Sequence, residues 1–407
     1  MKAPLTLPMP KGLSEWFWVS SVFLLPAATH LVPLALACFA GACIWEFVRP
    51  QRFRVSLSVL LSGPFFWLMC GLGLLWAGAE AQTSDPETKL SLLVLPIAGG
   101  WMHQAGKGSL ALFFRFLRLG CWLAFGVLIT QALYRYNLSH NPLEFAYQQF
   151  SPRLHPSYLS LYVLVVLGID AWLNPLAQTV RVRLFHAFSL TLFLFLLSSK
   201  AALATWMLLV VLFGISTLLK GRNKLRWWIG FTVLLIASAQ VLMRIPGIKE
   251  RFQEFSESTA WEGDFSPGST GMRIAIWKEG WQLAKDAPVW GYGTGAGKAK
   301  LVERYGEKGW AEMAERKLNA HNQFLQVFLN TGYPGLLLFL LMLGNLGRRH
   351  FALNRIWGTV LVLVLVLNLM VECMLETQAG TMFFGLLLSL YPVEKQAPQT
   401  PNVPETV

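Results

Sequence analysis

The chain has 407 residues, of which 54% are hydrophobic and only 14% are charged, and its mean hydropathy is +0.47. Soluble globular proteins carry about 25% charged residues, so this composition excludes an ordinary soluble enzyme and indicates a membrane protein. The net charge of +12 comes from basic residues scattered between apolar segments. Without a compact basic domain, we do not expect nucleic acid among the partners.

Apolar segments long enough to cross a bilayer recur along the whole sequence. A span needs about 20 largely apolar residues, and this length predicts an all-α, polytopic membrane protein of roughly twelve transmembrane helices. The predicted spans are 13–30, 31–48, 55–78, 89–104, 109–133, 156–175, 183–199, 201–219, 225–243, 321–346, 354–373 and 377–391.

These spans divide the chain into an N-terminal transmembrane bundle (1–243), a long polar loop with short helices (244–320), C-terminal transmembrane helices (321–391) and a tail of disordered composition (392–407). Basic residues gather at alternate ends of the spans, namely Lys2 and Lys11; Arg49, Arg52 and Arg54; Lys107; Arg181 and Arg183; Lys220, Arg222, Lys224 and Arg226; and Arg348, Arg349 and Arg355. The positive-inside rule therefore predicts that both termini are cytoplasmic and that the 244–320 loop lies outside.

The outer loop contains a predicted helix with an arginine near its start. Ser269 or Thr270 is suited to the N-cap position, and Asp286-Ala-Pro288 ends the helix. Arg273 then lies in the first turn, where a cation opposes the helix macrodipole. A bound anion would relieve this opposition, because a helix N-terminus and a guanidinium together form a phosphate site. The alternative is an ordinary solvated arginine, and position alone does not separate the two.

A glycine-rich turn, Gly291-Tyr-Gly293-Thr-Gly295-Ala-Gly297, follows this helix. It is not a dinucleotide-binding fingerprint, because the βαβ context is missing, and no Gly-Lys-Ser/Thr follows to make a P-loop. The pattern favours a flexible turn that folds the loop back towards the membrane.

His321 stands at the outer end of the next predicted span. Asn322, Gln326 and Asn330 form a polar stripe at four-residue spacing on the same helix. Amides in a membrane helix are costly to leave unpaired, so we expect this stripe to face the bundle or a wet cavity. A histidine beside such a cavity is suited to act as a general base for an acceptor hydroxyl. The alternative is a helix-end histidine that only hydrogen-bonds locally.

Other ionisable residues lie at the outer ends of predicted spans. Lys200 interrupts an apolar stretch, where it either snorkels or adds a second cation to an anion site. His155-Pro-Ser-Tyr158 begins another span, and we interpret it mainly as a helix cap. Glu372 and Glu376 crowd the last outer turn, where a carboxylate is either functional or paired with an arginine of the loop. No spacing of histidines and cysteines predicts a metal site.

At these residues the sequence resembles the O-antigen ligase and polymerase superfamily, integral membrane glycosyltransferases of bacteria. The matching segments are Arg273-x3-Trp277, Ala287-Pro288-x2-Gly291-x-Gly293, His321-Asn322-x2-Leu325, Gly332-x2-Gly335, Ser199-Lys200, Leu90-Ser-Leu-Leu-Val-Leu-Pro96 and His155-Pro-x-Tyr158. Their order and their place in the predicted topology carry the resemblance.

The resemblance implies a GT-C-like enzyme of the bacterial inner membrane with a periplasmic active site. Such enzymes transfer a glycan from undecaprenyl diphosphate to an acceptor hydroxyl, with inversion and without a metal ion or other cofactor. Ligases use the lipid A core as acceptor, so the implied partners are the lipid-linked donor, this core or another glycan, and membrane lipids. By motif, Arg273 and Lys200 would hold the diphosphate and His321 would engage the acceptor, although the family commonly has arginine where Lys200 stands. Supporting site residues would be Asn322, Trp277, Glu376, His155 and Tyr158.

Three other functions fit parts of the pattern. A polymerase of the same superfamily differs only in its acceptor, a second lipid-linked glycan, and the motifs do not separate it from a ligase. A protein O-glycosylating transferase is related, but no extra outer segment for a protein acceptor stands out. A transporter would place polar residues along mid-membrane helices, whereas here they gather at the outer ends. The expected activity is therefore that of a ligase.

Overall fold

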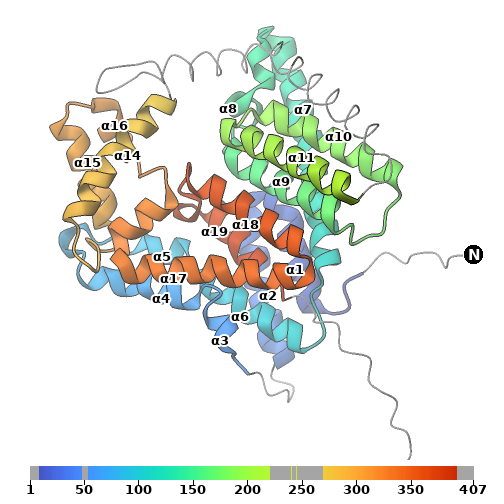
Figure 1. Cartoon of the computed structure of the whole chain (residues 1–407), viewed down its shortest axis with the longest axis horizontal. Coiled ribbons are helices and arrows are strands. Elements are labelled where there is room, and N and C mark those ends of the chain that lie inside the picture. Colours follow the sequence, from blue (N-terminus) through green and yellow to red (C-terminus); the bar gives the residue numbers. More distant parts are fainter. Residues whose placement is uncertain (1–8, 48–53, 221–239, 241–243, 245–268, 392–407) are drawn as a thin grey trace, which may run out of the picture.

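The computed structural model describes residues 9–47, 54–220, 240, 244 and 269–391, and within these ranges the chain is helical without a β-strand. Its longer helices are α1 (Leu13–Ala27), α2 (Val32–Phe47), α4 (Pro64–Leu72), α6 (Ser91–Gln104), α7 (Leu110–Ser139), α9 (Pro156–Trp172), α10 (Val180–Leu197), α11 (Lys200–Lys220), α14 (Ser269–Asp286), α15 (Ala296–Glu307), α17 (Gln323–Leu353), α18 (Arg355–Leu369) and α19 (Gln378–Leu388). Short elements connect them, namely η1 (Thr29–Leu31), α3 (Leu57–Leu60), η2 (Gly73–Leu75), η3 (Gly78–Glu80), α5 (Ser84–Thr88), η4 (Pro142–Phe145), α8 (Tyr147–Phe150), α16 (Ala311–Glu315) and η5 (Met374–Glu376). Figure 1 shows α14, α15 and α16 together at one end, with α17 leading from them into the remaining helices.

Most predicted spans coincide with single helices, so the predicted all-α fold is confirmed. Segments that are both long and apolar enough to cross a bilayer are Thr29–Glu46, Leu110–Ser139, Val180–Leu197, Lys200–Thr217 and Gln323–Leu353. Shorter apolar helices accompany them at Pro64–Leu75, Pro156–Trp172, Arg355–Leu369 and Gln378–Leu388. The total of roughly twelve spans stays a prediction. The span 225–243 apart from residue 240, the tail 392–407 and several basic residues used for orientation lie outside the described residues.

The prediction of one continuous helix over 55–78 is wrong. The chain turns at Gly63, whose φ of 134° lies in a region that favours glycine. A Cβ at this position would also clash with the Leu92 carbonyl group. α4 therefore begins after this turn and continues into η2. The prediction followed the apolar length across Ser62-Gly63-Pro64, where the chain turns, and the close approach of α6 explains the break.

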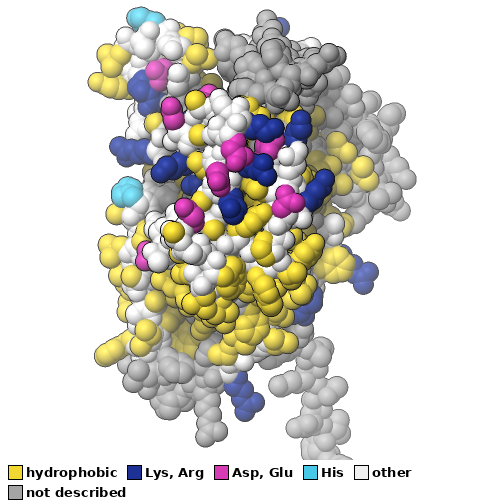
Figure 2. All heavy atoms as spheres, turned by 90° about the vertical axis from the view of Figure 1, so that its left-hand side faces the viewer, with side chains coloured by type: hydrophobic (Ala, Val, Ile, Leu, Met, Phe, Trp, Pro, Cys, Tyr) yellow, Lys and Arg dark blue, Asp and Glu magenta, His cyan; other side chains and the backbone are white. Residues whose placement is uncertain are grey.

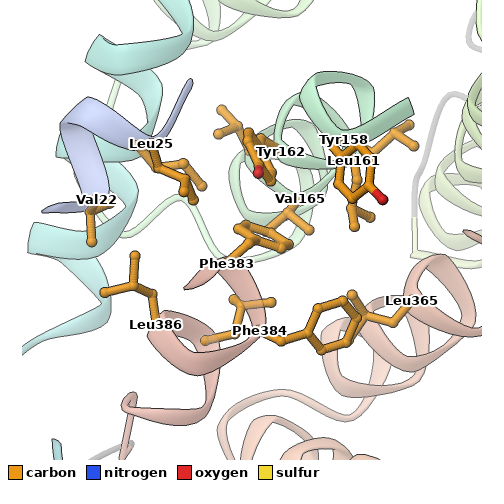
Figure 3. Close-up of a cluster of buried hydrophobic side chains, with 14 of the residues drawn as sticks. Val22, Leu25, Tyr158, Leu161, Tyr162, Val165, Leu365, Phe383, Phe384 and Leu386 are labelled. Carbon is orange, nitrogen blue, oxygen red and sulfur yellow. The ribbon is translucent and has the colours of Figure 1, made fainter. Parts of the chain in front are cut away.

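The main hydrophobic core joins helices that are distant in the sequence. Figure 3 shows side chains of α1, α9, α18 and α19 meeting around Phe383. The ring centroids of Tyr162 and Phe383 are 4.5 Å apart, and Tyr162 Oη donates to the Ala379 carbonyl oxygen at 2.9 Å. Because η5 directly precedes α19, this packing also fixes the turn that carries Glu372 and Glu376.

The three helices α14, α15 and α16 have a second core, which they share with the first turns of α17. Its buried members include Ile276, Leu283, Leu301, Tyr305 and Leu325. Figure 2 faces this end of the molecule and shows acidic and basic side chains interspersed in its upper half, above mainly hydrophobic ones. The end of the protein that carries α14–α16 therefore has charges of both signs close together.

The glycine turn is a packed junction rather than the flexible turn that the sequence favoured. Within 291–295, all three glycines have positive φ, and a Cβ at Gly293 would clash with Ala77. Backbone amides of the turn donate to the Leu329 carbonyl oxygen at 2.8 Å and to the Gly73 carbonyl oxygen at 3.1 Å. The turn thus connects α17 on one side to η2 on the other.

The predicted span 321–346 is bent at Gly332, whose φ of 60° and ψ of −156° are not helical. A Cβ at this position would clash with the Val289 carbonyl group, and Tyr333 N donates to that carbonyl oxygen at 3.0 Å. Pro334, which lacks an N–H, is two residues after Gly332. The bend lets the segment before the glycine turn pack against α17.

Candidate active site

Lys200 lies where the chain reverses between α10 and α11. Ser198 ends α10 in the left-handed conformation, with φ 49°, and α11 starts at Lys200 itself. The lysine Nζ donates to Thr270 Oγ1 at 3.2 Å. Thr270 and Arg273 are three residues apart in α14 and therefore share a helix face. The structure thus brings both predicted diphosphate-binding residues to the N-terminal turns of α14.

Arg273 lies one or two residues further into its helix than the sequence predicted. α14 begins at Ser269, so Ser269 and Thr270 are helical rather than N-caps, and Arg273 is in the second turn. The macrodipole effect falls off within the first turn and explains little of the position of this arginine. Its Nη2 donates instead to Glu372 Oε1. Pairing with a loop arginine is one of the two roles expected for the carboxylates of the last outer turn.

The same carboxylate also contacts the predicted acceptor-binding histidine. His321 Nδ1 lies 3.4 Å from Glu372 Oε2, while Arg273 takes the other oxygen. An ionised carboxylate can only accept hydrogen bonds, so the imidazole donates through Nδ1–H, which leaves Nε2 as its acceptor. We call these three residues the Arg273–Glu372–His321 cluster. They come from α14, the turn after α18 and the segment before α17.

Neighbouring residues fix the position of the histidine. His321 has a φ of 44°, in the left-handed region, and its backbone N donates to Asn319 Oδ1 at 3.1 Å. Trp277 Nε1 donates to the His321 carbonyl oxygen at 3.3 Å. Asn322 Oδ1 accepts from Leu325 N at 3.0 Å and so caps α17. Two of the supporting residues, Trp277 and Asn322, therefore hold the histidine, and a strained backbone held in this way is typical of functional sites.

Glu372 lies in the turn between α18 and η5, outside the apolar helices, and its side chain is 11% exposed. Burial by itself would raise the pKa of this carboxyl group. The hydrogen bond with His321 and the charge of Arg273 outweigh burial and lower the pKa from 4.5 to about 2. The carboxylate is therefore charged at neutral pH and stabilises positive charge on either neighbour.

The two α9 residues of the predicted site flank this cluster. His155 is the N-cap of α9, as the sequence indicated, and its Nδ1 accepts from Ser157 N at 3.3 Å. An electrostatic interaction with His155 makes a smaller contribution to the lowered pKa of Glu372. Tyr158 is buried, and a Cβ added at Gly380 would lie 3.1 Å from its ring. His155 therefore holds the start of α9, and Tyr158 packs against α19.

Two members of the predicted amide stripe of α17 are buried, and their contacts are with the segment before α17 and with α15. Gln326 and Asn330 are 1% and 6% exposed. Gln326 Oε1 accepts from Ala320 N at 3.0 Å, and its Nε2 donates to Asn330 Oδ1 at 3.3 Å. The stripe thus holds the segment before His321 in place.

A second buried charge cluster, formed by Lys89, Asp85 and Glu376, lies beside η5. Of these residues, only Glu376 was predicted from the sequence as a site residue. Lys89 is 1% exposed and pairs with Asp85 and, at 3.1 Å, with Glu376 Oε1. Gln323 Nε2 donates to the same Glu376 oxygen at 3.3 Å, and Gln323 Oε1 accepts from Leu375 N at 2.7 Å. This Lys89 cluster ties η5 to α5 and α17, so Glu376 supports the site structurally.

Comparison with known proteins agrees with the sequence motifs. Residues 185–340 match the family model described as O-antigen ligase. The matched segment contains Lys200, Arg273 and His321, whereas Glu372 and the charged residues of the Lys89 cluster lie outside it. A search of curated proteins found no match. The family match confirms the predicted resemblance and supports a membrane glycosyltransferase of the O-antigen ligase and polymerase type.

Proposed function

We propose that this protein, whose residues 185–340 are similar to O-antigen ligases, transfers a glycan from undecaprenyl diphosphate to a hydroxyl of the lipid A core on the periplasmic face of the bacterial inner membrane. The observation that carries the proposal is the convergence of Arg273 and His321 on the two oxygens of Glu372. Lys200, the first residue of α11, donates to Thr270 at the start of α14. A general base and two fixed cations are the groups that this transfer requires.

In the proposed reaction, Arg273 and Lys200 bind the donor diphosphate. Breaking the bond between the glycan and the diphosphate leaves negative charge on the leaving group, and fixed cations aimed at that charge lower the barrier. A guanidinium has five N–H donors, so Arg273 can keep its bond to Glu372 while other N–H groups meet phosphate oxygens. The two cations would thereby supply the charge neutralisation that a metal ion supplies in other enzymes.

His321 is the proposed general base. Its Nε2 takes the proton of the acceptor hydroxyl, whose oxygen bonds to the anomeric carbon as the bond from that carbon to the diphosphate oxygen breaks. Undecaprenyl diphosphate leaves with the electron pair, and Glu372 stabilises the imidazolium that forms. A single displacement from the face opposite the diphosphate inverts the anomeric configuration.

Replacement of the proposed base tests the proposal. In purified protein with a lipid-linked donor and lipid A core, we expect His321→Ala to lower turnover roughly 100- to 10,000-fold while donor binding is retained. The matched control is Arg304→Ala, which changes a half-buried residue of α15 whose partner is Glu307. That control should transfer at the wild-type rate. Unchanged turnover in His321→Ala would remove the histidine from the mechanism.

The choice of acceptor in the same assay separates the related activities. Glycan attached to the core identifies a ligase. Elongation of one lipid-linked glycan by another, with no product on the core, identifies a polymerase instead. A donor that stays intact with either acceptor contradicts a transferase and favours a transporter.

A further inference from the structure

A groove runs between the C-terminal half of α17 and α18, at the opposite end of α17 from His321. It is open on one side, and its volume is about 590 Å³. Its apolar floor includes Phe351, Val362 and Val366. Gly344 also lines the groove and leaves it unfilled, because a Cβ added there would meet no atom within 4 Å.

Two neighbouring arginines at this groove have different surroundings. Arg349 is buried and donates to the Leu388 carbonyl oxygen at 3.1 Å, so it closes the end of α19. Arg348 is exposed and lines the groove. It donates only to neutral oxygens, Ser58 Oγ at 3.4 Å and Asn345 Oδ1 at 3.2 Å. In the part of the chain that the structure describes, no carboxylate forms an ion pair with Arg348, so its charge is not neutralised there.

We propose that this groove binds an anionic phospholipid. The lipid phosphate meets the Arg348 guanidinium, and an acyl chain lies along Phe351, Val362 and Val366. An apolar channel beside an exposed cation matches an amphipathic anion, and basic pockets between transmembrane helices bind anionic headgroups on the cytoplasmic side. The positive-inside rule predicts the cytoplasm at this end of α17. The site is separate from the proposed transfer reaction.

Charge also argues against a second copy of this chain as the occupant. A symmetric contact between two chains uses the same surface patch twice. Pairing through the groove would therefore place two Arg348 side chains in one interface, and the residues that line the groove include no carboxylate. A lipid phosphate supplies the missing negative charge.

Native mass spectrometry of the purified full chain with added phosphatidylglycerol or phosphatidylcholine tests this proposal. The wild type should retain phosphatidylglycerol more tightly than phosphatidylcholine. Gly344→Leu fills the groove from a position where a side chain meets no other atom, and Arg348→Gln removes the charge. Each variant should weaken phosphatidylglycerol binding on the order of fivefold. Both positions are exposed, so we expect both variants to fold like the wild type, and thermal unfolding checks this.

Gly126→Leu is the matched control. Gly126 is also an exposed glycine of a long apolar helix with nothing within 4 Å of its added Cβ, but it belongs to α7. Phosphatidylglycerol binding should be unchanged in this variant. Equal phosphatidylglycerol binding by the wild type, Gly344→Leu and Arg348→Gln would overturn the proposal. So would a wild-type dimer that Gly344→Leu converts to a monomer, because the groove would then hold a second copy.

Discussion

Glu372 accepts hydrogen bonds from Arg273 and His321, one on each carboxylate oxygen. The sequence predicted Arg273 and His321 from their resemblance to family motifs, and it placed Glu372 among the outer carboxylates. It could not predict which carboxylate faces which partner. Arg273 and Glu372 are 99 positions apart, and only the packing of α19 decides that Glu372 meets the arginine while Glu376 meets Lys89.

The role of Glu372 as a positioning residue can be tested with Glu372→Gln. The amide keeps the size of the carboxylate but removes the charge that stabilises the imidazolium and selects its tautomer. We expect turnover to fall roughly 100- to 10,000-fold, with a smaller change in KM for the lipid-linked donor. Steady-state kinetics of the purified variant measure both constants. Turnover within about a factor of two of the wild type would show that Glu372 serves only the fold.

The lowered pKa of Glu372 predicts how acid affects stability. Its pKa is about 2 in the folded protein and 4.5 in the unfolded chain. The stabilisation is therefore fully present above pH 4.5 and is lost as the pH falls towards 2. Thermal unfolding between about pH 7 and pH 3 should show a steeper acid loss in the wild type than in Glu372→Gln. Parallel curves would contradict the pKa assignment.

At the level of elements, turns rather than helices place the site. Apolar length predicted most helices, because the bilayer fixes that length whatever the neighbouring elements are. The packing of the turn at Gly63, of the junction 291–295 and of the bend at Gly332 could not be predicted, since each depends on backbone that approaches from a distant segment. Lys89 was missed for the same reason. A lysine at the first residue of an apolar span usually lies at the interface, and contacts with η5 and α5 bury this one.

The bend in α17 can be tested with Gly332→Ala. The φ and ψ of Gly332 are accessible essentially only to glycine, and a Cβ would also clash with the Val289 carbonyl group. We expect a loss on the order of 1–3 kcal/mol in stability, together with reduced turnover because α17 begins beside His321. Apparent Tm and kcat measure the two effects. Gly344→Ala in the same helix is the control, since its Cβ meets nothing within 4 Å. Equal behaviour of the two variants would show that the bend is not required.

In the whole molecule, the candidate site lies between two hydrophobic cores. The outer helices α14–α16 have their own core, and the helix bundle has the other. Composition and apolar length predicted this membrane class from the sequence. The meeting of α14, α17 and the turn after α18 could not be predicted, because no pattern within one segment encodes contacts between segments. The orientation in the membrane, which follows from the distribution of basic residues, remains a prediction.

Labelling of introduced cysteines tests that orientation. Glu315 in α16 and Arg355 at the start of α18 are both exposed, whereas the natural cysteines are buried or half-buried. We expect a membrane-impermeant maleimide to label Glu315→Cys in intact spheroplasts and Arg355→Cys only after permeabilisation. The unsubstituted protein is the control for background labelling. The reverse pattern would place the Arg273–Glu372–His321 cluster on the cytoplasmic side.

The most direct test of the central claim is the product balance of a single reaction. Purified wild-type protein in nanodiscs is mixed with a lipid-linked glycan and lipid A core, and mass spectrometry quantifies the products. We predict glycan-bearing core and free undecaprenyl diphosphate in equal amounts, with both lost in Arg273→Ala. Unchanged donor in the wild-type reaction, or full product formation by Arg273→Ala, would contradict the account.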